Sequence, residues 1–322
     1  MRNLLEVTGL KKYFSTPAGQ LHAVDDVSFT IAQGKTLGVV GESGCGKSTL
    51  GRVVLGLSEA TAGEIRFQGE DITAASKRRR KELRKDMQLI FQDPFSSLNP
   101  RLCVSELIAE PLRVNKLCRS KQELWERTLA LMETVGLAQR LAYAYPHELD
   151  GGRRQRIGIA RALALNPKFI VCDEPVSALD VSIQAQILNL LQDLQEERGL
   201  TYIFITHDLS VVKHISDDIL VMYLGTVVEK SEAEDLFRQP MHPYTRGLLS
   251  AIPNPNLDAK RKRSILHGEI TSPVNPPAGC RFAARCPYCT EKCTKTAPAF
   301  RELQPGHFVA CHRAEELPQK IE

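Results

Sequence analysis

The sequence predicts an α/β protein whose sheet is largely parallel and is covered by helices on both faces. Strand-like apolar runs at residues 36–40, 169–173 and 201–206 alternate with helical patterns at 48–57, 155–165 and 182–198. Strands buried on both faces read as continuous apolar runs, and alternation with helices is typical of parallel sheets. A glycine-rich segment, Gly41–Ser48, stands between the first of these strands and the first helix.

Composition narrows the class of protein. The 322 residues are 43% hydrophobic and 25% charged, as in a soluble globular chain with one large domain and an appendage, or with two domains. The net charge of +4 gives no support to a nucleic-acid partner. No run approaches the roughly 20 apolar residues of a membrane-spanning helix, and the N-terminus lacks the apolar stretch of a secretory signal. We therefore expect a chain in the cytoplasm.

The glycine-rich segment fits the phosphate-loop pattern G-x-x-x-x-G-K-[ST]. Its glycines let backbone N–H groups cradle phosphate oxygens, Lys47 provides a charge to the β and γ phosphates, and the Ser48 hydroxyl suits Mg²⁺. The pattern predicts a site for ATP and Mg²⁺. The predicted contacts are Gly41, Ser43, Gly44, Cys45, Gly46, Lys47, Ser48 and Thr49.

A second motif follows another buried strand. The run Phe169-Ile-Val-Cys-Asp-Glu174 ends in two adjacent carboxylates. Asp173 is suited to the Mg²⁺ shell and Glu174 to an attacking water, a division of roles that phosphate hydrolysis requires.

The order of short motifs resembles that of ATP-binding-cassette (ABC) transporter ATPases. The motifs are GESGCGKST, FQDP, LDGGRRQRIGIARAL, VCDEP, SALD and ITHD. The resemblance implies a P-loop ABC ATPase fold with a mainly parallel core sheet, an antiparallel β subdomain and a helical subdomain. It places the nucleotide-binding domain at 1–235, with the helical subdomain at about 92–160. It also implies a dimer in which the phosphate loop of one subunit faces the LDGG-type signature of the other.

The same resemblance implies roles for single residues. Tyr13 would stack on adenine, and Gln92 would reach Mg²⁺ and the attacking water and link to the membrane partner. Glu174 would be the general base, Asp180 would couple the two sites, and His207 would lie near the γ-phosphate.

Longer segments resemble the ATPases of peptide and nickel importers. They are FQDPFSSLNPR, DEPVSALDVSIQAQILNLL, HDLSVV, HPYTRGLLSAIP at 242–253, and the cysteine-rich tail. This implies an ATP-hydrolysing subunit that powers import of di- or oligopeptides from the cytoplasmic face of the membrane. Its partners would be a second, related ATPase, two transmembrane permeases and an extracytoplasmic substrate-binding protein. A nickel or metal-chelate importer, a soluble ABC ATPase without a transport role, and an inactive scaffold remain as alternatives.

Residues 236–322 form a proline- and cysteine-rich segment. We expect an irregular C-terminal extension that builds little core of its own. Five cysteines spaced C-x5-C-x2-C-x3-C-x17-C predict a soft-ligand site for zinc or an iron–sulfur cluster. The importer ATPases show a C-x5-C-x6-C…C pattern, and this resemblance implies a structural [4Fe-4S] cluster, with Zn²⁺ as the alternative. It matches Cys280, Cys286, Cys293 and Cys311 and leaves Cys289 as an extra.

The signature departs from the family's usual Leu-Ser-Gly-Gly-Gln. Here it is Leu149, Asp150, Gly151, Gly152 and Arg153. An ionised Asp150 cannot donate to a γ-phosphate, and two unit charges about 4 Å apart repel by roughly 4 kcal/mol at an effective dielectric near 20. Arg153, Arg154 or a rotation of Asp150 would offset part of this. We expect a heterodimer with one poor site, the alternative being that Asp150 is tolerated and both sites work.

Overall fold

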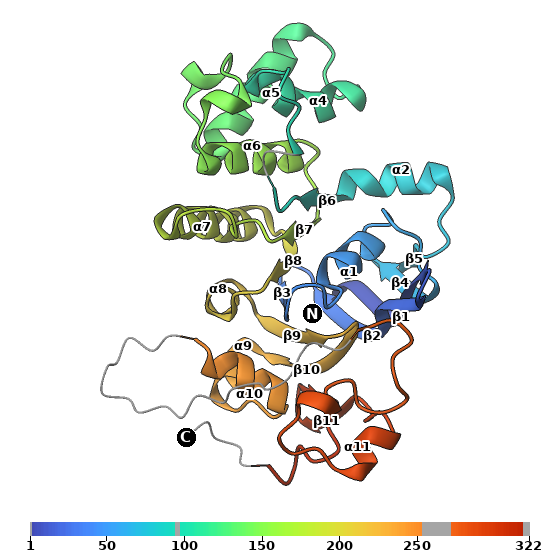
Figure 1. Cartoon of the computed structure of the whole chain (residues 1–322). Helices are drawn as coiled ribbons and strands as arrows, with labels where there is room; N and C mark the ends of the chain where they lie inside the picture. Colours follow the sequence, from blue (N-terminus) through green and yellow to red (C-terminus); the bar gives the residue numbers. More distant parts are fainter. Residues whose placement is uncertain (1, 94–96, 253–271, 318–322) are drawn as a thin grey trace, which may run out of the picture. The chain divides into compact units, whose positions relative to one another are not determined.

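The computed structural model describes residues 2–93, 97–252 and 272–317, which form two compact units (Figure 1). The first unit combines the chain up to Ala74 with the chain from Phe204 onward, and the second is Ala75–Ile203. Pro94 of the FQDP motif and Pro253 of the HPYTRGLLSAIP segment lie outside the described residues. None of the helices in the described part of the chain is long and apolar enough to cross a membrane.

The first unit begins with a small antiparallel sheet in the order β2-β1-β4-β5. Irregular register along β1 and β2 leaves Tyr13 paired with His22. The predicted antiparallel β subdomain is thereby confirmed. Its strands are β1 (Asn3–Thr16), β2 (Gly19–Ala32), β4 (Ala62–Phe67) and β5 (Glu70–Asp71).

A second sheet of the first unit carries the phosphate loop. Its strands lie in the order β11-β12-β10-β9-β3, with β3 parallel to β9 and the remaining pairs antiparallel. The strands are β3 (Thr36–Val40), β9 (Asp218–Tyr223), β10 (Thr226–Glu232), β11 (Arg301–Gln304) and β12 (His307–Val309). The helices of this unit are α1 (Lys47–Val54), α8 (Leu209–Ile215), α9 (Ala233–Arg238), α10 (Pro243–Ser250) and α11 (Glu291–Lys295), with a 3₁₀ turn at Ala283–Arg285.

The second unit is mostly helical around two parallel strands, β6 (Met87–Ile90) and β7 (Phe169–Asp173). Its α-helices are α2 (Lys77–Asp86), α4 (Val104–Val114), α5 (Lys121–Thr134), α6 (Gly151–Leu163) and α7 (Val181–Arg198). Two 3₁₀ turns lie at Gln139–Leu141 and Pro146–Glu148, and β8 (Thr201–Thr206) runs from this unit into the first. As the helical pattern at 182–198 predicts, α7 ends at Arg198, and its C-cap is Gly199, whose left-handed φ of 62° suits glycine.

The C-terminal extension is more regular than the sequence suggested. Residue Pro243 begins α10 instead of breaking it, because the first helical position needs no N–H donor. Strand β12 pairs with β10. Tyr244, Leu249 and Phe282 share a core cluster with residues of β9 and β10. These short elements pack against the sheet and share its core. The expectation of an irregular extension was therefore wrong for α10 and β12.

A buried carboxylate fastens the extension to the sheet. Glu229 of β10 has no solvent exposure. Its oxygens accept hydrogen bonds from the backbone N–H groups of Met241 (2.6 Å) and His242 (3.0 Å), and one lies 2.8 Å from His307 Nε2. A single buried side chain therefore links the start of α10 to strand β12.

Replacing that side chain tests how the extension is attached. Glu229→Ala leaves buried donors without an acceptor, and we expect a loss of about 3 kcal/mol of stability. The measurement is the urea midpoint, together with the rate of proteolysis within 240–317. Glu315→Ala removes an exposed ion pair with Arg301 and should change stability by less than about 0.5 kcal/mol. Equal midpoints for the two variants would contradict this role of Glu229.

Candidate functional site

Two glycines set the shape of the predicted phosphate loop. Gly41 follows the fully buried β3, and Gly46 precedes α1; their φ angles are 152° and 106°. A Cβ atom at Gly41 would lie 2.2 Å from the Met222 carbonyl oxygen, and one at Gly46 would lie 1.9 Å from that of Ala23. Only glycine fits either position. The loop thus runs from the end of a strand to the N-terminus of a helix, where backbone N–H groups attract anions.

Lys47 lies within this loop as the sequence predicts. Its side chain is buried, and its ammonium donates to the carbonyl oxygens of Gly41 (2.8 Å) and Glu42 (3.0 Å). Burial raises the pKa of the neighbouring Cys45 thiol. Of the other predicted contacts, Ser43 and Gly44 are exposed, whereas Ser48 and Thr49 are half-buried on the first turn of α1.

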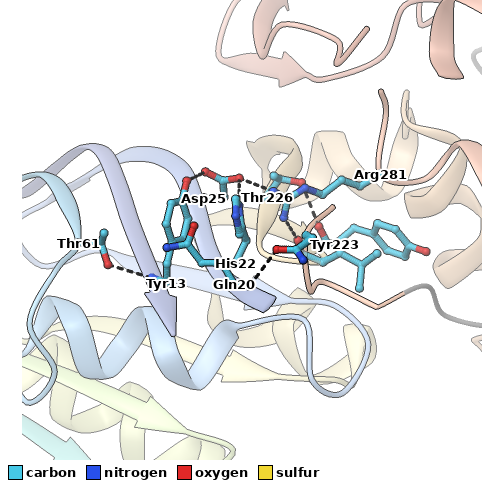
Figure 2. Close-up of polar contacts among 10 residues, drawn as sticks. Tyr13, Gln20, His22, Asp25, Thr61, Tyr223, Thr226 and Arg281 are labelled. Carbon is cyan, nitrogen blue, oxygen red and sulfur yellow. Dashed lines mark hydrogen bonds and ion pairs between the residues drawn. The ribbon is translucent and has the colours of Figure 1, made fainter. Parts of the chain in front are cut away.

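Tyr13 is held by a polar cluster that the sequence did not reveal. Figure 2 shows its hydroxyl donating to Asp25, and its ring stacks on His22 with centroids 4.0 Å apart. His22 Nδ1 lies 3.0 Å from the Asp25 carboxylate, and the Tyr13 N–H donates to the Thr61 hydroxyl at 3.0 Å. Burial and the bond to Asp25 raise the pKa of Tyr13, so its hydroxyl remains a donor. The orientation of the ring is therefore set by several contacts.

The second unit brings two predicted catalytic residues together. Gln92, after β6, donates through Nε2 to Glu174 Oε2 at 2.8 Å. Asp173 is buried at the end of β7, and the next residue, Glu174, has a positive φ of 47°. Such a backbone is unfavourable for a non-glycine residue and often marks a functional position. The strained turn aims the Glu174 carboxylate at the Gln92 amide.

The signature begins α6. Asp150 is the N-cap of this helix: its Oδ1 accepts from the Arg153 N–H at 2.8 Å and its Oδ2 lies 3.3 Å from Arg153 Nη1. Leu149 is buried before the cap. Arg154, by contrast, is buried and donates to the Pro146 carbonyl. Arg153 therefore compensates charge at Asp150, and a share for Arg154 stays a prediction.

The signature glycines and the remaining predicted residues lie at helix starts. Added Cβ atoms at Gly151 and Gly152 would come within 3.0 Å of Leu179 and Ile183 side chains. Asp180 is the exposed N-cap residue of α7. His207, in the first unit, is exposed directly after β8 and precedes Asp208, which caps α8.

The four predicted cysteine ligands line one small cavity of about 20 Å³. They are Cys280, Cys286, Cys293 and Cys311; Cys289 is exposed and does not line it. Burial raises the pKa of the Cys280 and Cys286 thiols to about 11. No group of three or more His, Cys, Asp or Glu side chains in residues 2–93, 97–252 and 272–317 is arranged to hold a metal ion. The four thiols are ligands of the kind that a soft metal takes, and they line the same cavity. Their side chains are not arranged as a metal site.

Sequence reasoning missed the residues that connect the extension to the nucleotide-binding loops. Arg285 binds Glu42 and Arg281 binds Asp25, across 243 and 256 residues of sequence. Tyr244 accepts the N–H of Glu42 at 2.9 Å. A single sequence contains no local signal for pairs so far apart.

Two family models match the chain. The ABC transporter model matches residues 24–177, and the model of the oligopeptide/dipeptide transporter C-terminal region matches residues 228–293.

Curated relatives match over almost the whole length. A putative oligopeptide transport ATP-binding protein of Bacillus subtilis is 51% identical over 99% of this chain and 98% of its own. A putative peptide import ATP-binding protein of Brucella ovis is 53% identical over 96% of this chain and 98% of its own. The oligopeptide transport ATP-binding protein of Salmonella typhimurium is 50% identical over 98% and 97%.

Solved structures share the fold. The dimeric post-hydrolysis state of an ATP-binding cassette bound to ADP and phosphate matches with a TM-score of 0.66 and 29% identity, covering 71% of this chain and 98% of that one. The structure of cbiO1 from Clostridium perfringens, part of the ABC transporter complex cbiONQ, matches with a TM-score of 0.66 and 27% identity, covering 74% of this chain and 91% of that one.

Proposed function

This chain belongs to the ATP-binding subunits of oligopeptide ABC transporters, and we propose that Glu174, oriented by Gln92, is the general base of its ATP hydrolysis. The chain is an ATPase that powers peptide import. The contact of 2.8 Å between Gln92 Nε2 and Glu174 Oε2 is the observation that carries the assignment. A carboxylate oriented by an amide can polarise a water toward a phosphorus atom.

We propose the other roles from the family motifs that these residues match. Lys47 and the N-terminus of α1 bind the phosphates of ATP. Ser48 and Asp173 would hold Mg²⁺, Tyr13 would stack on adenine, and His207 would contact the γ-phosphate. Asp180 transmits the state of one site to the other.

The transport partners are separate chains. The subunit acts at the cytoplasmic face of the membrane, bound to two permeases that receive an oligopeptide from an extracytoplasmic binding protein. Relatives named for oligopeptide or peptide transport support peptides over nickel or a metal chelate as cargo.

Changing the base to its amide tests the hydrolysis role. Glu174→Gln keeps the shape of the side chain and its hydrogen-bonding reach but removes the proton acceptor. We expect ATP binding to remain and turnover at this chain's phosphate loop to fall at least about 100-fold, with the ATPase dimer trapped closed. The measurement is single-site ATPase activity of the assembled importer, with the partner's site silenced. Wild-type turnover would refute the assignment.

We also propose that Cys280, Cys286, Cys293 and Cys311 hold a [4Fe-4S] cluster, or Zn²⁺ as the alternative. Their convergence on one cavity supports the choice of these four over Cys289. Thiolates are the ligands that both groups take. The bound group would stabilise the fold of the cysteine-rich part of the extension, which has few core residues of its own.

The two kinds of cysteine provide a matched comparison. In protein purified without oxygen, Cys286→Ser should lower the metal content by at least about half and make residues 272–317 protease-sensitive. Cys289→Ser should leave both properties unchanged, because Cys289 is exposed outside the cavity. Elemental analysis and the visible spectrum distinguish iron–sulfur from zinc. The same metal content in both variants would exclude Cys286 as a ligand.

A third proposal concerns asymmetry between the two ATP sites. The chain pairs with a related ATPase that has a serine signature, and the site completed by Asp150 hydrolyses poorly. The capping bond and the Arg153 contact hold the Asp150 carboxylate as an acceptor at the helix start. An ionised carboxylate is only an acceptor and has no proton to offer a γ-phosphate from the opposite subunit.

Lysine changes in the two subunits separate the sites. Lys47→Ala in this chain should remove most of the ATPase activity of the complex, because the competent site contains this phosphate loop. The matching change in the partner should remove little. Asp150→Ser should activate the weak site, and since serine is an equally good N-cap, α6 should keep its stability. Equal losses from the two lysine changes would falsify the asymmetry.

A further inference from the structure

The turn between Cys280 and Cys286 contacts the phosphate loop directly. The Arg285 guanidinium binds both carboxylate oxygens of Glu42, at 2.7 and 3.0 Å. Glu42 is the second residue of the phosphate loop, and its carbonyl oxygen is an acceptor for Lys47. Its N–H donates to the hydroxyl of Tyr244, another residue of the extension. The residue is thus held through its side chain, its N–H and its carbonyl.

The contact between Arg285 and Glu42 is shielded from water. The two side chains are 7% and 23% exposed, and the hydrogen bond to Glu42 raises the pKa of Arg285. Bidentate guanidinium–carboxylate pairs fix direction as well as distance. Removing either partner leaves the other poorly solvated. The position of the Glu42 peptide therefore depends on the extension.

The same turn reaches Tyr13 through a second arginine. Figure 2 shows Arg281 bonded to Asp25. Arg281 also donates to the Leu224 carbonyl oxygen. Asp25 in turn accepts the Tyr13 hydroxyl and contacts His22. Burial alone would raise the pKa of Asp25, but bonds from His22 and Tyr13 and the charge of Arg281 hold it below its usual value. Asp25 therefore remains the anion to which both Tyr13 and Arg281 bind.

Both arginines come from one short turn. Arg285 is the last residue of the 3₁₀ turn Ala283–Arg285, and Arg281 precedes Phe282, the residue before that turn. The Phe282 ring is buried against Tyr223 and Tyr244, with centroids 5.2 and 5.5 Å away. The aromatic anchor fixes the turn, so Arg281 and Arg285 cannot shift independently of it.

From these contacts we propose that the turn at 281–285 is a positioning element of the nucleotide site, with two separable branches. Arg285 positions the phosphate loop through Glu42, and Arg281 positions the base-stacking ring through Asp25. The extension thereby sets the affinity of this subunit for ATP. The proposal rests on the nucleotide site assigned above and adds to it the control of that site by the C-terminal segment.

The proposal predicts that changes at Arg281 and at Arg285 affect the binding of ATP and of tripolyphosphate differently. In the assembled importer with the partner's site silenced, both Arg281→Met and Arg285→Met should weaken ATP binding roughly tenfold. Inorganic tripolyphosphate has no base to stack. Its competition against labelled ATP should weaken in Arg285→Met and stay unchanged in Arg281→Met. Arg281→Lys keeps the charge and should recover part of the ATP affinity.

Further variants exclude a general folding defect. Glu42→Gln should weaken tripolyphosphate binding as Arg285→Met does, and the double variant should add little, because both remove one contact. Arg301→Met breaks an ion pair with Glu315 elsewhere in the extension and should change neither ligand.

The outcomes are distinct. Unchanged affinities in both arginine variants, or equal weakening of ATP and tripolyphosphate in both, would overturn the proposal. Lys47→Ala serves as the reference. If that variant retained ATP binding and turnover at this site, the assignment of the nucleotide site itself would have failed, whatever the arginine variants show.

Discussion

The close approach of backbone to backbone at Gly41 and Gly46 is the constraint on which the site depends. The Met222 and Ala23 carbonyls leave no room for a side chain at either position, so the loop can take only one path from β3 to α1. The two carbonyls belong to β9 and β2, which also carry Tyr223, His22 and Asp25. Strands β9 and β2, which shape the phosphate loop, therefore also carry the residues that support Tyr13 and contact the extension.

Two arginines of the extension, Arg281 and Arg285, add charged contacts to this backbone frame. The influences on their pKa values differ. Burial is the largest influence on Arg281 and lowers its pKa, whereas the bond to Glu42 dominates at Arg285 and raises its pKa. A buried ion pair often stabilises a fold little in net terms. The Arg281–Asp25 pair is therefore better understood as fixing the direction of a ring than as a source of stability.

Local sequence patterns predicted loops and the ends of helices and strands. They did not predict side-chain contacts between residues far apart along the chain. The loop at 41–48, the end of α7 at Gly199 and the strand ending at Asp173 each follow from neighbouring residues. The support of Tyr13 by Asp25 and Arg281 joins residues 256 apart along the chain, and no periodicity records it. The prolines of the extension were misleading for a related reason: Pro243 begins a helix, and the preceding residue, His242, is held by Glu229, which lies outside the local pattern.

Asp150 shows how a fold can accept a change that alters its chemistry. A helix N-cap needs a side-chain oxygen that accepts a backbone N–H, and aspartate meets this need as well as serine does. The Asp150 carboxylate accepts the Arg153 N–H and so caps α6. Folding therefore places no penalty on Asp150. In the dimer that we propose, a phosphate presented by another subunit would meet an acceptor where a serine hydroxyl would donate. The consequence of the departure at Asp150 would then fall on nucleotide chemistry.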